Sequence, residues 1–217
     1  MALVPLMADS PAAPAAIDMI FGYAESFLQD ESVEVFLCVM TTLQKSAPLL
    51  QKNEALLRTM LEWLTKHAEH DNWRVRRSVI LAMAPVTKSL GEEEFKSKLM
   101  EIYMRSFEDK ISKVRLAAAQ AISQLRDAFG APFVMTNVLQ HLSDKYHMMT
   151  YYLYRIAAVE AHASIVHADL DSATMQTVVH FLRNACEDGV PNVRFTAIKA
   201  LGSAAQYADD TIVAEIR

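Results

Sequence analysis

The stretch DNWRVRRSVILAMAP, residues 71–85, sets a tryptophan and three arginines around the start of an apolar run that no glycine interrupts. Val75, Val79 and Met83 recur every four residues within it, which is the spacing of the buried stripe of a helix. Asp71 comes just before, where a carboxylate can bind the free amides of a helix N-terminus. The stretch therefore predicts an acidic turn followed by an amphipathic helix.

The valine-arginine pair of this stretch recurs along the chain. Equivalent pairs are separated by 39, 40 and 39 residues: Val75-Arg76, Val114-Arg115, Tyr154-Arg155 and Val193-Arg194. Forty residues before Arg76, the chain has Val35-Phe36, so the valine is kept and the arginine is replaced. A fixed period of this length is typical of helical repeat proteins, and five units are visible.

The composition favours an all-α protein. Five glycines and seven prolines in 217 residues are too few for the tight turns of a β-sandwich or barrel. The net charge of −5 gives no general attraction to nucleic acid or to an anionic membrane. No apolar segment has the length of a membrane span or signal peptide. The isolated Cys38 and Cys186 indicate a reducing compartment, so we expect a cytoplasmic protein that also enters the nucleus.

Each unit reads as two amphipathic helices joined by a short turn. We predict a right-handed α-solenoid that forms a single domain over residues 1–217. Its five repeats cover approximately these ranges: 12–50, 51–90, 91–130, 131–170 and 171–207. The stretches MALVPLMADSP and DDTIVAEIR, at the two ends, read as parts of flanking helices. We expect such imperfectly capped ends to self-associate.

Several residues have predicted structural roles within the repeats. Asp30, Asp109 and Asp188 each lie six residues before the arginine or its Phe36 replacement. Carboxylates and guanidinium groups at fixed places in stacked units can form a ladder of hydrogen bonds, and we assign Arg76, Arg115 and Arg194 to it. Gly91 and Gly130 are placed to end helices in the left-handed conformation. Pro85 should kink its helix, whereas Pro191 falls in a first turn, where its missing amide costs nothing.

The helix pair with an aspartate in its turn and valine-arginine at the start of its second helix resembles the HEAT repeat. Three stretches resemble, in order and spacing, the C-terminal half of the scaffold (A, regulatory) subunits of protein phosphatase type 2A. They are DNWRVRRSVILAMAPVTKSLG from residue 71, YLYR from residue 152 and PNVRFTAIKALGSAA from residue 191. The resemblance implies a non-catalytic scaffold without a cofactor or metal. Its intra-repeat turns would bind a serine/threonine phosphatase catalytic subunit, and a further regulatory subunit would complete the assembly.

Carried over by position, the resemblance implies six partner-binding residues, two from each of three turns: Trp73, Arg74, Tyr152, Arg155, Asn192 and Arg194. Tryptophan, tyrosine and arginine are also the residues most enriched in interface hot spots. The sequence departs from the family pattern at Ser112, where an aromatic residue is common. It also departs at Phe36 and in the turn before Arg155, which lacks an aspartate at the usual spacing.

Other sites are less well supported. The arginines of residues 73–77 could bind nucleic acid, but no recognised binding motif accompanies them. His67, His70 and Asp71 could approach a metal, but they fit a helix C-terminus and its turn better. Met148 and Met149, near a turn with Tyr151 and Tyr152, could form an adaptable contact. An alternative function is a HEAT-repeat adaptor of another class, either a transport receptor or a chromosome-associated scaffold.

Overall fold

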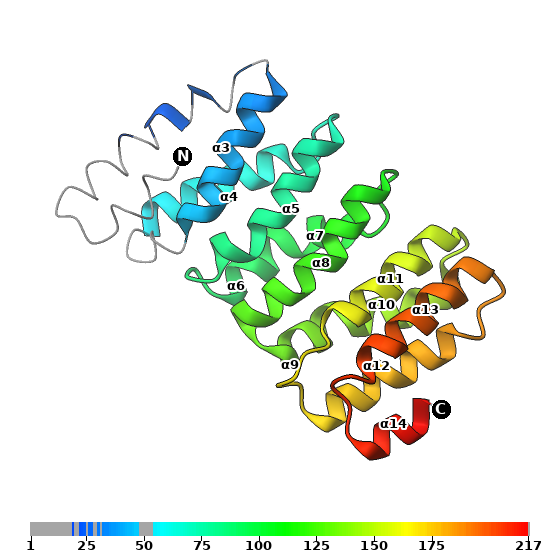
Figure 1. The fold of residues 1–217 in the computed structure, drawn as a ribbon. Coiled ribbons are helices and arrows are strands. Elements are labelled where there is room, and N and C mark those ends of the chain that lie inside the picture. The colour runs from blue at the N-terminus through cyan, green and yellow to red at the C-terminus, as the bar shows by residue number, and fades with distance from the viewer. Residues whose placement is uncertain are drawn as a thin grey trace. The chain divides into compact units, whose positions relative to one another are not determined.

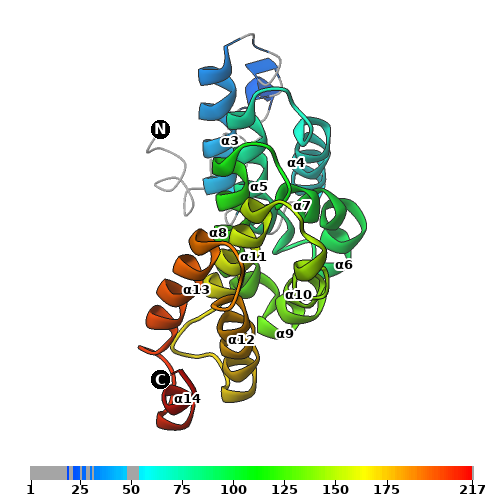
Figure 2. The ribbon, with the colours of Figure 1, turned by 90° about the vertical axis from the view of Figure 1, so that its right-hand side faces the viewer.

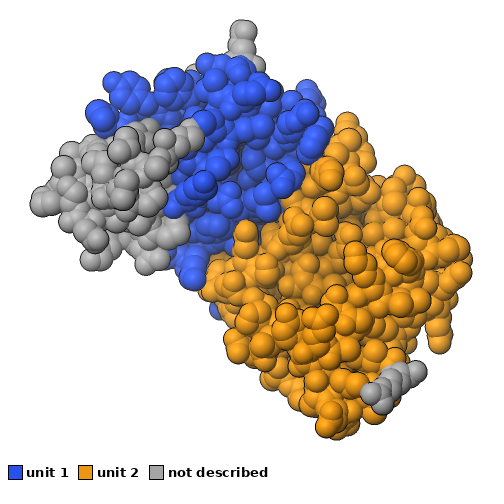
Figure 3. Space-filling model, in the orientation of Figure 1, with its two compact units in different colours: residues 1–103 blue, residues 104–217 orange. Residues whose placement is uncertain are grey.

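The computed structural model describes residues 19, 22–24, 26–27, 30, 32–47 and 54–216, and within these ranges every regular element is a helix (Figure 1). The predicted all-α repeat fold is confirmed, and Figure 2 shows the helices from the side. None of the described helices is long and apolar enough to cross a membrane. The chain divides into two compact units, residues 1–103 and 104–217 (Figure 3).

Unit 1 contains three long helices: α3 (Val33–Ser46), α4 (Glu54–His67) and α5 (Trp73–Thr87). They are followed by α6 (Glu92–Glu94), the π-helical segment η2 (Phe95–Leu99) and the start of α7 (Met100–Ser106). α5 packs against both α3 and α4. The residues predicted to form its apolar stripe are buried: Val75, Val79 and Met83. The stretch MALVPLMADSP and most of the expected first helix of repeat 12–50 lie outside the described residues.

Unit 2 repeats this arrangement. Its elements after α7 are α8 (Ser112–Phe129), α9 (Ala131–Val134), η3 (Met135–Leu139), α10 (Gln140–Lys145), η4 (Tyr146–Met148), α11 (Tyr152–Ser164), α12 (Ser172–Ala185), α13 (Pro191–Ala204) and α14 (Asp210–Ile216). α11 packs between α8 and α13, and α12 packs against α11 and α13. Within this unit α8, α11 and α13 form one layer, and α10 and α12 form the other (Figure 1). We call α3, α5, α8, α11 and α13 the second helices, because each follows the turn of its repeat.

A glycine with positive φ follows two of the second helices. Gly130 ends α8 with φ of 88°, as predicted, whereas α5 is capped by Lys88, and Gly91, with φ of 97°, lies at the start of α6 instead. A π-helical segment begins shortly after each glycine. In these segments the amide of Met100 bonds the carbonyl of Phe95, and the amide of Gln140 bonds that of Met135. Such wide turns hold an extra residue, and the apolar spacing did not predict them.

Pro85 lies inside α5, which continues to Thr87. A proline has no amide, so the carbonyl of Leu81, four residues earlier, loses its usual helical partner. The side-chain amide of Gln44 on α3 donates to this carbonyl at 2.9 Å. The neighbouring helix thus satisfies the group that the proline leaves open. Pro191 begins α13, as expected.

Candidate protein-binding turns

The arginine of each repeat fixes the turn that precedes its own helix. In four repeats the guanidinium Nη1 donates to the backbone carbonyl six residues earlier. The bonds are Arg76 to His70 at 2.7 Å, Arg115 to Asp109 at 2.6 Å, Arg155 to Met149 at 2.6 Å and Arg194 to Asp188 at 2.7 Å. We call these residues the turn arginines. Because a guanidinium has several rigidly placed donors, one side chain can hold a turn and still bond elsewhere.

The aspartates of the turns bond backbone amides two residues ahead. Oδ1 of Asp30 accepts from Ser32 at 2.7 Å, and Oδ1 of Asp109 accepts from Ile111 at 2.8 Å. Asp188 bonds Val190 in the same way at 2.8 Å. These bonds shape the turn before the helix, as Asx turns do. The prediction that Asp71 caps α5 is wrong, since Asn72 is the cap and its Oδ1 accepts from the amide of Arg74 at 2.9 Å.

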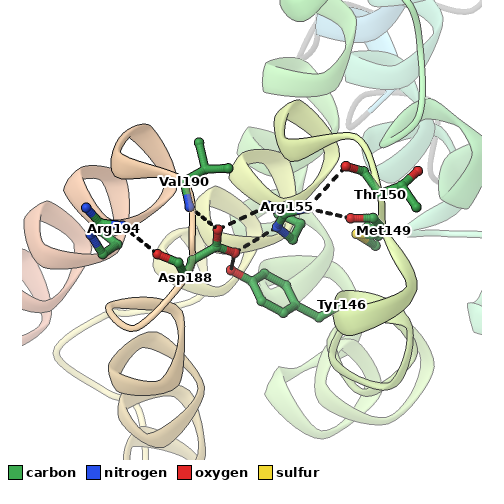
Figure 4. A network of polar contacts seen from close by, with 7 residues as sticks. All are labelled: Tyr146, Met149, Thr150, Arg155, Asp188, Val190 and Arg194. Carbon is green, nitrogen blue, oxygen red and sulfur yellow. Dashed lines mark hydrogen bonds and ion pairs between the residues drawn. The ribbon is translucent and has the colours of Figure 1, made fainter.

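One complete rung of the predicted ladder lies between the last two turns of unit 2 (Figure 4). Nε and Nη2 of Arg155 donate to the two carboxylate oxygens of Asp188 at 2.7 and 3.0 Å. The hydroxyl of Tyr146 donates to the same carboxylate at 2.9 Å. Only 15% of the Arg155 side chain and 5% of the Asp188 side chain are exposed. This is a buried, bidentate ion pair that links successive repeats.

The rung changes the acidity of its members. Burial raises the pKa of the Asp188 carboxyl, but bonds from Arg155, the Val190 amide and Tyr146 outweigh burial, and the net pKa is lowered. The pKa of Arg155 is raised, chiefly by its bond to Asp188. Burial, followed by the bond to Asp188, raises the pKa of Tyr146. At neutral pH the carboxylate is therefore charged and Tyr146 is a neutral donor.

This rung is made by Arg155, which is not among the arginines that we assigned to the ladder. Arg155 was expected to face a partner, yet its side chain bonds inside the chain. Arg115 and Arg194 were expected to bond carboxylates, yet each bonds a backbone carbonyl. The guanidinium of Arg115, 4% exposed, also lies 5.9 Å from the ring centre of Tyr154. The turn before Arg155 has no aspartate at the usual position, and the ring that faces Arg115 belongs to Tyr154, in the first turn of α11.

Trp73 and Arg74 begin α5 in unit 1. Arg74 is exposed and its guanidinium lies 4.9 Å from the ring centre of Trp73, which is half-buried. A cation stacked on an indole presents a flat, amphipathic surface to solvent. This pair is therefore available for contact with another protein.

The turn before α11 exposes a cluster of apolar side chains in unit 2. Tyr151 is 49% exposed and Met148 is 70% exposed, whereas Met149, which we expected to share the contact, is buried. The ring of Tyr151 lies 5.1 Å from that of Tyr154 and 5.9 Å from that of Tyr152, which is half-buried. Of this cluster, the resemblance implied only Tyr152 as a partner-binding residue, although Met148 and Tyr151 are more exposed. Asn192, at the start of α13, is exposed at the same edge of the unit.

The residues considered for a metal have other contacts. Nδ1 of His67 lies 2.8 Å from the carbonyl of Trp63, and burial lowers the pKa of its imidazole. Nδ1 of His70 accepts from the amide of Asn72 at 3.0 Å. Both histidines lie close to Phe36, with ring centres 4.9 and 6.3 Å away. Across the described part of the chain, no three histidine, cysteine, aspartate or glutamate side chains gather as a metal site would require.

Comparison with known proteins identifies a HEAT repeat at residues 178–208, which cover the end of α12 and all of α13. No curated protein matches the chain. Among solved structures, a designed armadillo repeat protein is 15% identical with a TM-score of 0.45, and the match covers 89% of this chain and 85% of that one. A second designed armadillo repeat protein, solved with a (KR)4 peptide, is 16% identical with a TM-score of 0.45, covering 93% and 98%.

Proposed function

We propose that this chain is a non-catalytic scaffold whose turns bind a partner protein, and that the partner is a serine/threonine phosphatase catalytic subunit. The observation that carries the proposal is that turns fixed by buried arginine bonds present exposed aromatic and methionine side chains. Rigid aromatic anchors lose little conformational entropy on binding, which makes them effective hot spots. The resemblance of residues 71–91 and 191–205 to type 2A scaffold subunits supports the choice of partner.

The proposal places the contact on Trp73, Arg74, Tyr152 and Asn192, together with Met148 and Tyr151. Arg155 and Arg194 contribute by holding their turns in place. The same proposal locates the protein in the cytoplasm and nucleus, where a regulatory subunit would join the complex.

A binding experiment tests the site. Purified type 2A catalytic subunit is titrated against the wild-type chain, against the Trp73→Ala, Arg74→Ala double variant and against Arg77→Ala as control. Arg77 is exposed on the same helix and carries the same charge, but lies outside the turn. We expect the double variant to bind at least about tenfold more weakly, because it removes two anchors, and the control to bind normally.

Unchanged affinity of the folded double variant would contradict the site. Failure of the wild type to bind any phosphatase, with a transport GTPase or chromosome-associated proteins dominating an affinity purification, would favour the adaptor of another class. Turnover by the purified chain that is lost on substitution of His67 or His70 would contradict the non-catalytic role.

A further inference from the structure

The turn before α11 lacks a side-chain bond that the other turns with a turn arginine have. In those turns the residue six positions before the arginine accepts from the backbone amide two residues ahead. These bonds are His70 with Asn72 at 3.0 Å, Asp109 with Ile111 at 2.8 Å and Asp188 with Val190 at 2.8 Å. Met149 occupies this position before α11, and its thioether is only a weak acceptor. The turn therefore depends on support from outside its own sequence.

Arg155 supplies part of that support. Its Nη1 donates to the carbonyl of Met149 at 2.6 Å and to that of Thr150 at 3.4 Å. Met148 directly precedes these two residues and Tyr151 directly follows them, so the held carbonyls lie between the two exposed side chains of the turn. The position of the guanidinium therefore determines where Met148 and Tyr151 are presented.

A carboxylate from the next repeat fixes that guanidinium. Nε and Nη2 of Arg155 donate to the two oxygens of Asp188 at 2.7 and 3.0 Å. Because a guanidinium is a rigid planar fork, fixing two of its nitrogens also fixes the direction of Nη1. The hydroxyl of Tyr146, at the start of the turn, donates to the same carboxylate at 2.9 Å (Figure 4). Asp188 thus holds the segment between Tyr146 and Thr150 from both ends.

Asp188 is held in place but is not available for contact with another protein. Only 5% of its side chain is exposed. Its carboxylate accepts from the amide of Val190, and its backbone carbonyl accepts from Nη1 of Arg194 at 2.7 Å. A group that is buried in this way can affect binding only through the residues that it orients. Orientation matters because side chains that are already in place lose less conformational entropy on binding.

We propose that Asp188 is a positioning residue for the exposed side chains of Met148 and Tyr151, so that the carboxylate of one repeat sets the binding surface of the repeat before it. The inference rests on the proposed binding of a partner at these turns. It adds that this surface is controlled from the turn before α13, close to Asn192. The two turns then act as one binding unit, and a change at Asp188 weakens a contact that lies in another repeat.

Hydrogen exchange of the free, full chain tests the positioning without a partner. Asp188→Asn keeps the size of the side chain but removes its charge and one of its two acceptors. It should speed exchange at the amides of Met149 and Tyr154, which bond carbonyls of the turn, by at least about tenfold. Met175→Ala is the matched control, because it lowers stability through a core cavity at the opposite end of α12. It should leave exchange at these two amides close to that of the wild type.

Titration with the type 2A catalytic subunit tests the effect on binding. Asp188→Asn should weaken binding by at least about fivefold, but should have little further effect once Tyr151→Ala has removed the anchor. In the Trp73→Ala background the full loss should remain, because that contact lies in the other unit. A general loss of stability would act equally in both backgrounds, so the comparison isolates the positioning of Tyr151.

Two results would overturn the proposal. The first is exchange at Met149 and Tyr154 that Asp188→Asn leaves unchanged or that Met175→Ala speeds equally. The second is a loss of affinity from Asp188→Asn that is the same with and without the Tyr151 side chain. A wild-type chain that binds no phosphatase would contradict the proposed function alone, because exchange in the free chain still decides whether Asp188 positions the turn.

Discussion

Phe36 in unit 1 and Arg155 in unit 2 occupy equivalent positions near the start of a second helix, yet different forces hold them. Phe36 is 4% exposed and lies against the rings of His67 and His70. Arg155 bonds the carbonyl of its own turn and the carboxylate of Asp188. The same place is thus filled by an apolar contact in one repeat and by a buried ion pair in another.

The difference teaches that a repeat position is defined by its neighbours rather than by one residue type. Phe36 packs against the rings of two histidines, and its side chain needs no charged partner. An arginine at the same place needs acceptors, because a buried cation without them is costly, and Arg155 finds them in the carbonyl of its own turn and in Asp188. The two repeats should therefore respond differently to substitution, salt and pH.

The largest effect should come from removing the apolar contact. Phe36→Ala leaves a cavity beside His67 and should lower the free energy of unfolding by about 3 kcal/mol. Urea unfolding followed by circular dichroism measures this. Phe36→Leu serves as the matched control and should cost less than about 1.5 kcal/mol, since most of the volume is kept. A similar small loss in both variants would mean that Phe36 contributes little to packing.

Breaking the ion pair should have the next largest effect. Asp188→Ala leaves Arg155, the Tyr146 hydroxyl and the Val190 amide without their shared acceptor, and should cost about 2–3 kcal/mol. Asp169→Ala, in an exposed pair with His167, should change stability by less than about 0.5 kcal/mol. The double variant Arg155→Met, Asp188→Ala should be more stable than Asp188→Ala alone, because no unpaired cation remains. Equal stability of the double and single variants would show that the pair is not coupled.

The acid sensitivity of unit 2 should give a smaller effect. His162 on α11 replaces an apolar residue of the other second helices, is 2% exposed, and stacks on Phe181 at 3.6 Å. Its Nδ1 donates to the Ala158 carbonyl, and its Nε2 lies 2.9 Å from the Ser143 hydroxyl. Burial lowers the pKa of His162 to about 4, against a bond to Ala158 that raises it.

Since the pKa of His162 is depressed in the folded state, its neutral form favours folding. The stabilisation of the folded state by neutral His162 is complete above about pH 6.5, the pKa of a histidine in the unfolded chain. It is lost as the pH falls toward about 4, the pKa of His162 in the folded state. Unfolding measured at pH 7 and pH 5 should differ by on the order of 1–2 kcal/mol from this group. His162→Gln should reduce the difference, whereas His141→Gln, at an exposed site, should preserve it. An unaltered pH dependence in His162→Gln would assign it to another group.

Much of the fold could be predicted because its signals are local. The recurring valine-arginine pair, the apolar spacing and the two glycines each act within one repeat, and the helices, turns and left-handed glycines follow them. The turn arginines show where local reasoning stops. Their bond to the carbonyl six residues earlier repeats in four repeats, but a carbonyl carries no side-chain signature, and we looked for a carboxylate instead.

By itself, the sequence determined that this chain is a series of helix pairs whose turns carry arginine and aromatic residues, because period and amphipathic spacing are properties of neighbouring residues. The tertiary structure decided which arginine is buried and which side chains are open. Arg155 meets Asp188 across 33 residues of sequence, and Ile198 is exposed while Val159 is buried, because helix packing sets both. Those choices depend on which helix lies beside which, and they separate the side chains that hold the repeats together from those that can bind another protein.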